Sequence, residues 1–206
     1  MKKSLVVAGL LLAGSSLMAD IQPFVGIDLN KVDADVSTKL NGTVTYYGNS
    51  VSNLTIDESA KDTAVSGKIG VIIDNSHRTY LSYGKYSDDG GKLTNSLLNY
   101  DYLFKTSNEK YRPFVGIHIG QAKYENDNFE ISKTGTAYGF QGGIIYDINN
   151  NVSLELGASY TTFNAEAKTP TLNASLYNGN LTLSNVNITS EVENASRISI
   201  GLNYKF

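Results

Sequence analysis

The residue types that carry out catalysis or bind metal ions are scarce in this chain. Its 206 residues include no cysteine and two histidines, His77 and His118, which excludes thiolate chemistry and leaves few ligands for zinc. His77 closes the run Asp74-Asn-Ser-His77, whose residue types are typical of a turn, and His118 has no obvious nucleophile beside it. Nucleophilic catalysis needs a base directed at a reachable nucleophile. We therefore expect no catalytic residues, no metal site and no cofactor.

Acidic residues are concentrated in four polar segments that could attract a divalent cation. None of these segments has the ligand spacing of an EF-hand loop. We interpret them as a solvated anionic surface, with cation binding as the alternative. The segments are Asp57-Glu58, Asp88-Asp89-Gly90-Gly91, Glu125-Asn-Asp127 and Glu191-Val-Glu193.

Composition narrows the class of protein. Apolar residues make up 41% of the chain, charged residues 18%, and the mean hydropathy is −0.20, which excludes a helical membrane protein with several apolar runs of about 20 residues. The 14 tyrosines and 7 phenylalanines argue against a disordered chain. The formal net charge of −3 provides no basic surface, so we expect no nucleic-acid partner.

The first 19 residues have the parts of a secretory signal peptide. Met1-Lys2-Lys3 is basic, residues 5–12 are apolar apart from Gly9, and Ala19 ends the segment with a small side chain. An N-terminal membrane anchor is the weaker alternative, because the apolar run is too short to cross about 30 Å of hydrocarbon as a helix. We expect Sec-dependent export, cleavage after Ala19 and a mature chain of residues 20–206.

The rest of the chain alternates between apolar and polar residues, which indicates β-strands. In the segment 111–123, for example, Val115 and Ile117 alternate with Gly116 and His118. We expect an all-β fold with eight antiparallel strands. Their expected ranges are 21–32, 63–73, 78–86, 93–104, 111–123, 135–148, 152–162 and 194–206.

The connections between these strands alternate in length. Residues 74–77, 105–110 and 149–151 are short, whereas 33–62 and 163–193 are long. Short turns at one end and long loops at the other are typical of an up-and-down transmembrane barrel, and an even strand number places both termini at the short-turn end. The alternation of Leu181-Thr-Leu-Ser-Asn-Val-Asn-Ile188 leaves open that the long loops continue the strands as hairpins.

Eight alternating strands are also compatible with a soluble, ligand-carrying barrel that is apolar inside. The polar residues that alternate with the apolar ones favour the inverted arrangement, a barrel that is apolar outside and polar inside. These residues include many glycines and charges of both signs. A narrow interior needs small residues, and charges are tolerated there when they are paired. We predict a lumenal charge network in which Glu155 pairs with Arg197. Its members are Asp28, Lys68, Asp101, Arg112, Glu155 and Arg197.

Among the apolar residues of the strands, the aromatic ones lie toward the two ends of the strands, as expected at the two interfaces of a bilayer. Three lie toward the long connections and four toward the short turns. We predict that they form two aromatic girdles around an aliphatic band. They are Tyr83, Tyr138 and Tyr160 at one end, and Tyr102, Phe104, Tyr111 and Tyr146 at the other.

The final strand, Ile198-Ser-Ile-Gly-Leu-Asn-Tyr204-Lys-Phe206, completes a resemblance to a known family. A signal peptide, eight alternating strands and a closing strand that ends in Phe206 resemble the small bacterial outer-membrane β-barrels, which include the OmpA-type transmembrane domain, OmpX and the opacity-type proteins. The resemblance implies a Gram-negative outer-membrane location and contact with outer-membrane lipid and lipopolysaccharide. It also implies that Tyr204 and Phe206 form the assembly signal read by the barrel-insertion machinery.

The family includes anchors, adhesins, narrow pores and a few lipid-modifying enzymes, so the resemblance leaves the function open. We expect a monomeric surface-interaction protein that presents residues 33–62 and 163–193 to a host or cell-surface partner. The alternative is a narrow pore for ions or small solutes, and a lipid-modifying enzyme is a remote third. An eight-stranded barrel is only wide enough for its own side chains, and Phe24 and Phe114 are expected to point inward, which favours a closed lumen.

Overall fold

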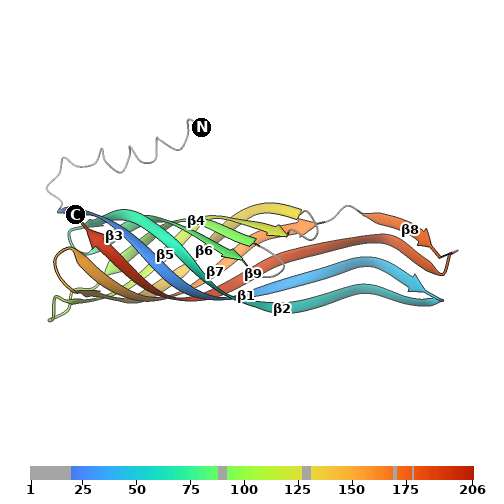
Figure 1. Ribbon diagram of the computed structural model, residues 1–206, viewed down its shortest axis with the longest axis horizontal. Helices are drawn as coiled ribbons and strands as arrows, with labels where there is room; N and C mark the ends of the chain where they lie inside the picture. The colour runs from blue at the N-terminus through green and yellow to red at the C-terminus, as the bar shows by residue number, and fades with distance from the viewer. Residues whose placement is uncertain (1–19, 88–91, 127–130, 169–170, 178) are drawn as a thin grey trace, which may run out of the picture.

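The computed structural model describes residues 20–87, 92–126, 131–168, 171–177 and 179–206. These residues form a barrel from which a long ribbon of strands projects (Figure 1). The signal peptide predicted for residues 1–19 lies outside the described residues and stays a prediction. The strands are β1 (Ile21–Tyr46), β2 (Asn49–Ile73), β3 (His77–Ser87), β4 (Lys92–Leu103), β5 (Tyr111–Asn126), β6 (Ile131–Asp147), β7 (Val152–Lys168), β8 (Leu172–Leu176) and β9 (Leu181–Lys205).

Eight of these strands close the barrel, so the predicted fold class is confirmed. Strands β1 to β7 pair with their neighbours in sequence, β7 pairs with β9, and β9 returns to β1, all antiparallel. One row of paired residues runs around the wall from Phe24 through Gly70, Tyr80, Asn99, His118, Gly139, Thr161 and Ala195, and returns to β1 at Ala34, ten residues further along. This displacement tilts the strands by about 40° from the barrel axis.

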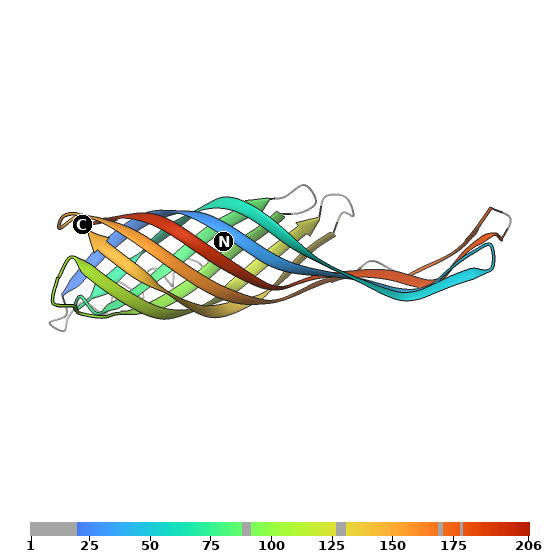
Figure 2. The same cartoon turned by 90° about the horizontal axis from the view of Figure 1, so that it is seen from below.

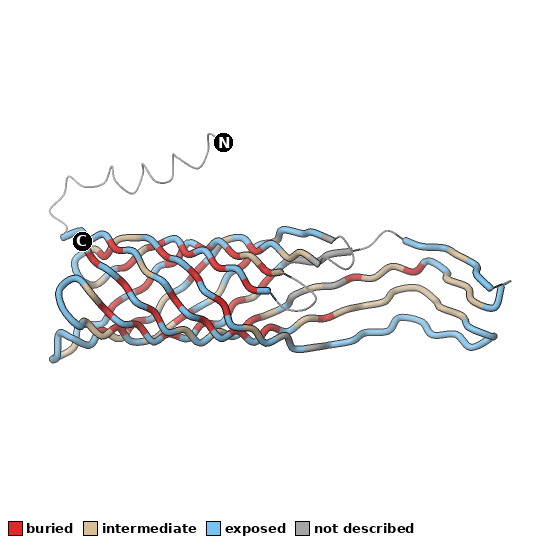
Figure 3. Tube along the Cα trace, in the orientation of Figure 1, coloured by how far each residue is buried: buried red, intermediate tan, exposed pale blue. Residues whose placement is uncertain are grey.

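The barrel is apolar outside and polar inside, because the strand pleat sends successive side chains to opposite faces. Ile27, Ile69 and Ile117 are 55%, 61% and 64% exposed on the outer wall, whereas Lys68 and Glu155 are buried inside. A soluble ligand-carrying barrel would have the opposite pattern, so that alternative is wrong. Buried and exposed residues accordingly alternate along the strands of the barrel (Figure 3).

The two ends of the barrel differ as expected. Residues 74–76, 104–110 and 148–151 make short connections at one end. The first and last described residues lie there too: the amide of Asp74 donates a hydrogen bond to the carbonyl of Asp20 at 2.9 Å, and the amide of Phe206 donates one to the carbonyl of Pro23 at 3.0 Å. In the described part of the chain, no helix has the length and hydropathy needed to cross a membrane.

At the other end, the chain departs from the expected ranges, because the strands run well beyond the barrel. Strands β1, β2 and β9 continue side by side, and the short β8 adds to the edge of β9 (Figure 2). The segments 33–62 and 163–193 are therefore mainly β-strands rather than irregular loops, which confirms the hairpin alternative. We call residues 33–62, 172–177 and 179–193 the distal ribbon.

Candidate functional site: the barrel interior and the distal ribbon

The carboxylate of Glu155, on β7, is the centre of a buried network of charges inside the barrel. Lys68 donates a hydrogen bond to this carboxylate at 2.9 Å, and Arg78 donates two at 2.6 and 3.2 Å. The side-chain amide of Asn203 donates a fourth at 3.1 Å. These donors come from β2, β3 and β9, so the network joins separate parts of the wall. Glu155 thereby receives the paired environment that a buried carboxylate needs.

Each of the two cations also contacts a second carboxylate. Arg78 lies 2.7 Å from Asp101, and Lys68 lies 2.8 Å from Asp28. The side-chain amide of Gln141 donates a further hydrogen bond to Asp101 at 2.6 Å. Arg78 and Asp101 are 1% and 0% exposed, so this cluster is almost inaccessible to solvent.

Two glycines make room for the carboxylates. A Cβ atom at Gly116 would collide with Asp101 Oδ1, and one at Gly201 would collide with Asp28 Oδ1. These glycines therefore leave the space that the carboxylates of the charge network occupy, which explains their presence although glycine weakens a strand.

Aromatic and aliphatic side chains form a buried cluster on the short-turn side of this network. The Arg78 guanidinium lies 4.8 Å from the ring centre of Phe114, 5.0 Å from that of Tyr80 and 5.8 Å from that of Phe24, distances at which cation–π attraction operates. The expectation that Phe24 and Phe114 point inward is confirmed. The buried cluster consists of Phe24, Ile72, Tyr80, Leu103, Phe114 and Ile145.

A second apolar cluster is buried on the ribbon side of the network. Its larger side chains are Tyr86, Leu93, Leu97 and Phe163. The rest of this cluster consists mainly of alanines, which suit the narrow space between opposite walls. The charge network around Glu155 thus lies between two buried apolar clusters.

The structure brings together four of the six predicted network residues: Asp28, Lys68, Asp101 and Glu155. Arg112 is buried but belongs to a separate cluster near the short turns. There it lies 2.9 Å from Asp147, which also contacts Lys205 at 2.7 Å. This second cluster links the end of β9 to the end of β6.

The predicted pairing of Glu155 with Arg197 is wrong. Glu155 lies opposite Gly201, whereas Arg197 lies opposite Ser159, four residues further along β7, and donates a hydrogen bond to its hydroxyl at 3.0 Å. The prediction assumed that midpoints of neighbouring strands oppose one another. The stagger of a tilted barrel shifts that register.

Sequence reasoning missed Arg78, which forms ion pairs with Asp101 and Glu155. It also missed Tyr80, whose hydroxyl accepts a hydrogen bond from Gln141 at 2.8 Å. A usable signal was present, because Arg78 and Tyr80 alternate along β3 with Leu81 and Tyr83, which are exposed on the outer face. Strand parity therefore identifies which charges point inward, although it does not identify their partners.

The two histidines lie on different strands, with His77 exposed and His118 buried. His118 is buried, and its Nε2 lies 3.0 Å from the hydroxyl of Thr161. His77 is on the surface near the short turns, with Nδ1 2.7 Å from the hydroxyl of Tyr100. Within the described ranges, no cluster of three His, Cys, Asp or Glu residues could hold a metal ion.

The predicted girdle residues all place their rings at the outer surface. Six are at least 37% exposed, and Tyr146 is half-buried against Tyr111, with ring centres 5.0 Å apart. Tyr204 and Phe206 are also exposed and meet edge to face at 5.1 Å. That these rings lie at bilayer interfaces, and that Tyr204 and Phe206 act as an assembly signal, stay predictions.

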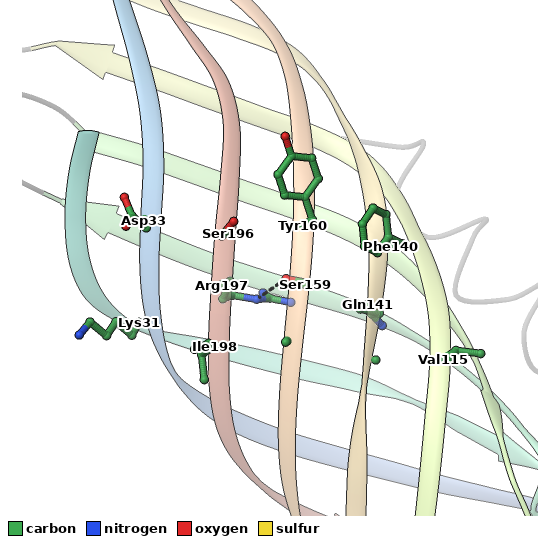
Figure 4. A pocket seen from close by; sticks show the side chains of 12 residues that line it. Lys31, Asp33, Val115, Phe140, Gln141, Ser159, Tyr160, Ser196, Arg197 and Ile198 are labelled. Atoms are coloured by element: carbon green, nitrogen blue, oxygen red, sulfur yellow. Dashed lines mark hydrogen bonds between the residues drawn. The ribbon is translucent and has the colours of Figure 1, made fainter. Parts of the chain in front are cut away.

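A shallow hollow interrupts the apolar outer wall (Figure 4). Two of its lining residues, Gly142 and Ala158, pair across β6 and β7. Val115 and Ile198 flank this pair along the same row. The adjoining row contains Phe140 and Tyr160, whose rings stack at 5.7 Å, and Arg197 lies behind the wall. The hollow is therefore a local consequence of two small residues in an otherwise bulky surface.

The distal ribbon is held by its backbone pairing and by a few polar contacts near its base. Ser37 donates a hydrogen bond to Asp57 at 2.8 Å. Lys39 donates one to Glu191, and this bond raises the pKa of Lys39 above its ordinary value. The acidic pairs at 57–58 and 191–193 thus lie on the ribbon, whereas residues 88–91 and 127 lie outside the described residues.

Solved structures with a similar fold are outer-membrane proteins. Neisserial surface protein A is 18% identical, with a TM-score of 0.51 over 86% of this chain and 97% of its own. OprG from Pseudomonas aeruginosa is 14% identical, with a TM-score of 0.57 over 90% of this chain and 96% of its own. No protein-family model matches the sequence, and neither does any curated protein. The chain therefore has the fold of the small outer-membrane β-barrels.

Proposed function

We propose that the protein spans the outer membrane of a Gram-negative bacterium and displays the distal ribbon at the cell surface. The exposed apolar wall supports this location, because water would not tolerate so continuous an apolar band around a barrel. The short turns then face the periplasm, and the ribbon extends outside the cell. The observation that carries the proposal is the continuation of β1, β2 and β9 far beyond the barrel as ordered strands.

The barrel serves as an anchor in this proposal rather than as a channel. The charge network around Glu155 and the apolar clusters on either side of it are buried inside the barrel, and they support a closed lumen. An ion would have to separate buried ion pairs to pass, which is costly. A surface-interaction role uses the ribbon and leaves the interior to stability, and it assigns no catalytic activity to either histidine.

Removal of the ribbon tests the proposal. A variant in which short turns replace residues 36–58 and 166–191 keeps all residues of the charge network. We expect this variant to insert in the outer membrane at the normal level and to lose attachment of the cells to the surfaces that wild-type cells bind. Unchanged attachment would contradict the proposal.

Planar-bilayer recordings test the closed interior separately. Refolded wild-type protein is expected to show no steady single-channel conductance. Stable, reproducible channel openings would instead support the narrow-pore alternative. Glu155→Ala serves as a comparison, because loss of the shared carboxylate is expected to allow leak events.

A further inference from the structure

The end of the distal ribbon is formed by two turns from opposite parts of the sequence. Tyr47 and Gly48 connect β1 to β2, and a second turn connects β8 to β9. The amide of Tyr47 donates a hydrogen bond to the carbonyl of Asn180 at 2.9 Å, which joins the two turns. We call residues 45–50, 176–177 and 179–182 the tip.

Three tyrosines are exposed at the tip. Tyr46, Tyr47 and Tyr177 are 57%, 64% and 75% exposed. The rings of Tyr46 and Tyr47 meet edge to face with centres 4.7 Å apart. Tyrosine is well suited to contact a ligand because it combines an apolar face with a polar end.

Two of these tyrosines have a backbone conformation that their side chains disfavour. The φ angles of Tyr47 and Tyr177 are 46° and 52°, in the left-handed region. Asparagine or glycine is the usual residue at such a turn position, because a bulky side chain is strained there. Neither ring is buried in return, so folding of the ribbon does not explain the choice of tyrosine, whereas contact with a ligand does.

The tip and the ribbon next to it are uncharged. The segments 40–56 and 169–190 contain no Asp, Glu, Lys, Arg or His. Around the tyrosines lie hydroxyl and amide side chains, including Ser50, Thr45 and Asn180, and the hydroxyls of Thr45 and Ser50 are 2.8 Å apart. Such a surface has nothing to attract phosphate, sulfate or a charged peptide, and much to offer a neutral, hydroxyl-rich ligand.

We propose that the tip binds a neutral carbohydrate. The C–H face of a sugar ring packs against an aromatic ring, and sugar hydroxyls exchange hydrogen bonds with amides and hydroxyls, so the residues of the tip match this chemistry. A stable protein partner would need about 800 Å² on each side, more than two short turns provide. The inference rests on the proposed surface role and specifies its ligand class.

An oligosaccharide array tests the inference with the full mature chain in lipid nanodiscs. The array carries neutral, sialylated and sulfated oligosaccharides. We expect binding to neutral members, with little change between about 0.15 and 1 M NaCl because no charges take part. Tyr47→Asn and Tyr177→Asn place a residue that the left-handed turn prefers, so they keep the fold. Each is expected to weaken binding by about tenfold or more, as at contact tyrosines of other interfaces.

Ile56→Thr is the matched control, because it also removes an exposed apolar group from the ribbon but lies outside the tip. Its binding is expected to equal that of the wild type. Binding restricted to sulfated or sialylated oligosaccharides, or equal binding by the tyrosine variants, overturns the inference. Ribbon-dependent cell attachment without any array binding overturns it too, assigns the tip to a protein partner and leaves the proposed surface role intact. Cell attachment that survives removal of the ribbon contradicts the surface role itself.

Discussion

At the scale of single residues, Glu155 accepts hydrogen bonds from two cations that have few other partners. Lys68 and Arg78 are both almost inaccessible to solvent, and each contacts one further carboxylate besides Glu155. Because a buried charge without a partner is costly, the contribution of Glu155 is larger than that of an ordinary surface ion pair.

Glu155→Ala is expected to lower the free energy of unfolding in detergent micelles by about 3–5 kcal/mol, because two buried cations lose their shared acceptor. The double variant Glu155→Ala with Arg78→Ala should lose less free energy of unfolding than the sum of the two single losses, with a coupling of about 1 kcal/mol or more. Arg197→Ala is the matched control, since Arg197 contacts Ser159 instead. Its effect should add to that of Glu155→Ala within about 0.5 kcal/mol. Urea titrations of the single and double variants measure both couplings.

Gly116→Ala is expected to lower the free energy of unfolding by about 1–3 kcal/mol, because the new Cβ would displace Asp101 or the neighbouring backbone. Gly67 lies on the outer face of β2, where an added Cβ atom would have open space for 4 Å around it. Gly67→Ala should therefore change the same free energy by no more than about 0.5 kcal/mol. Equal losses for the two alanine variants would mean that Asp101 is not held in place by this contact.

At the scale of strands, sequence alternation predicts the barrel well because a two-residue period identifies both the strand and its inner face. The strand expected at 93–104 is found as Lys92–Leu103, and the one expected at 152–162 begins at Val152 as predicted. Register is not encoded in the same local way. It depends on the stagger of the closed barrel, which is why Arg197 was placed opposite the wrong residue.

The ribbon was underpredicted for a different physical reason. Segments 33–62 and 163–193 contain many Asn, Ser and Thr residues and few large apolar residues, so their pattern is close to that of loops. Their pairing depends on three strands lying together rather than on the intrinsic preference of each. Strand propensity is set by such neighbours more than by residue type.

Deletion of Phe206 is expected to reduce outer-membrane assembly in cells far more than it reduces stability. Phe206 is 68% exposed, its amide donates one hydrogen bond to Pro23, and its ring contacts Tyr204. Its loss should change the free energy of unfolding of the refolded protein by about 1 kcal/mol, the value of one net hydrogen bond. Normal assembly of the deletion variant in cells would contradict the role of Phe206 as an assembly signal.

At the scale of the whole molecule, the outer wall determines the conditions in which the chain folds. The mature chain is expected to need detergent or lipid, because folding in water would leave Ile27, Ile69, Ile117 and their neighbours exposed. Circular dichroism and sedimentation of the chain in plain buffer, compared with micelles, measure this requirement. A soluble, compact, β-rich monomer in buffer would contradict the transmembrane interpretation.

The pairing of β1 with β9 runs without a change of partner from Phe24–Lys205 near the short turns to Tyr46–Leu181 at the tip. This seam both closes the barrel and joins the first hairpin of the ribbon to the last. Tyr47 reaches the tip from the N-terminal side of the seam, and Tyr177 and Asn180 reach it from the C-terminal side. A barrel whose seam is still open therefore carries two half-tips and no complete one. Ligand binding at the tip therefore requires completed assembly, because the same β1–β9 backbone pairing that completes the tip also closes the barrel wall.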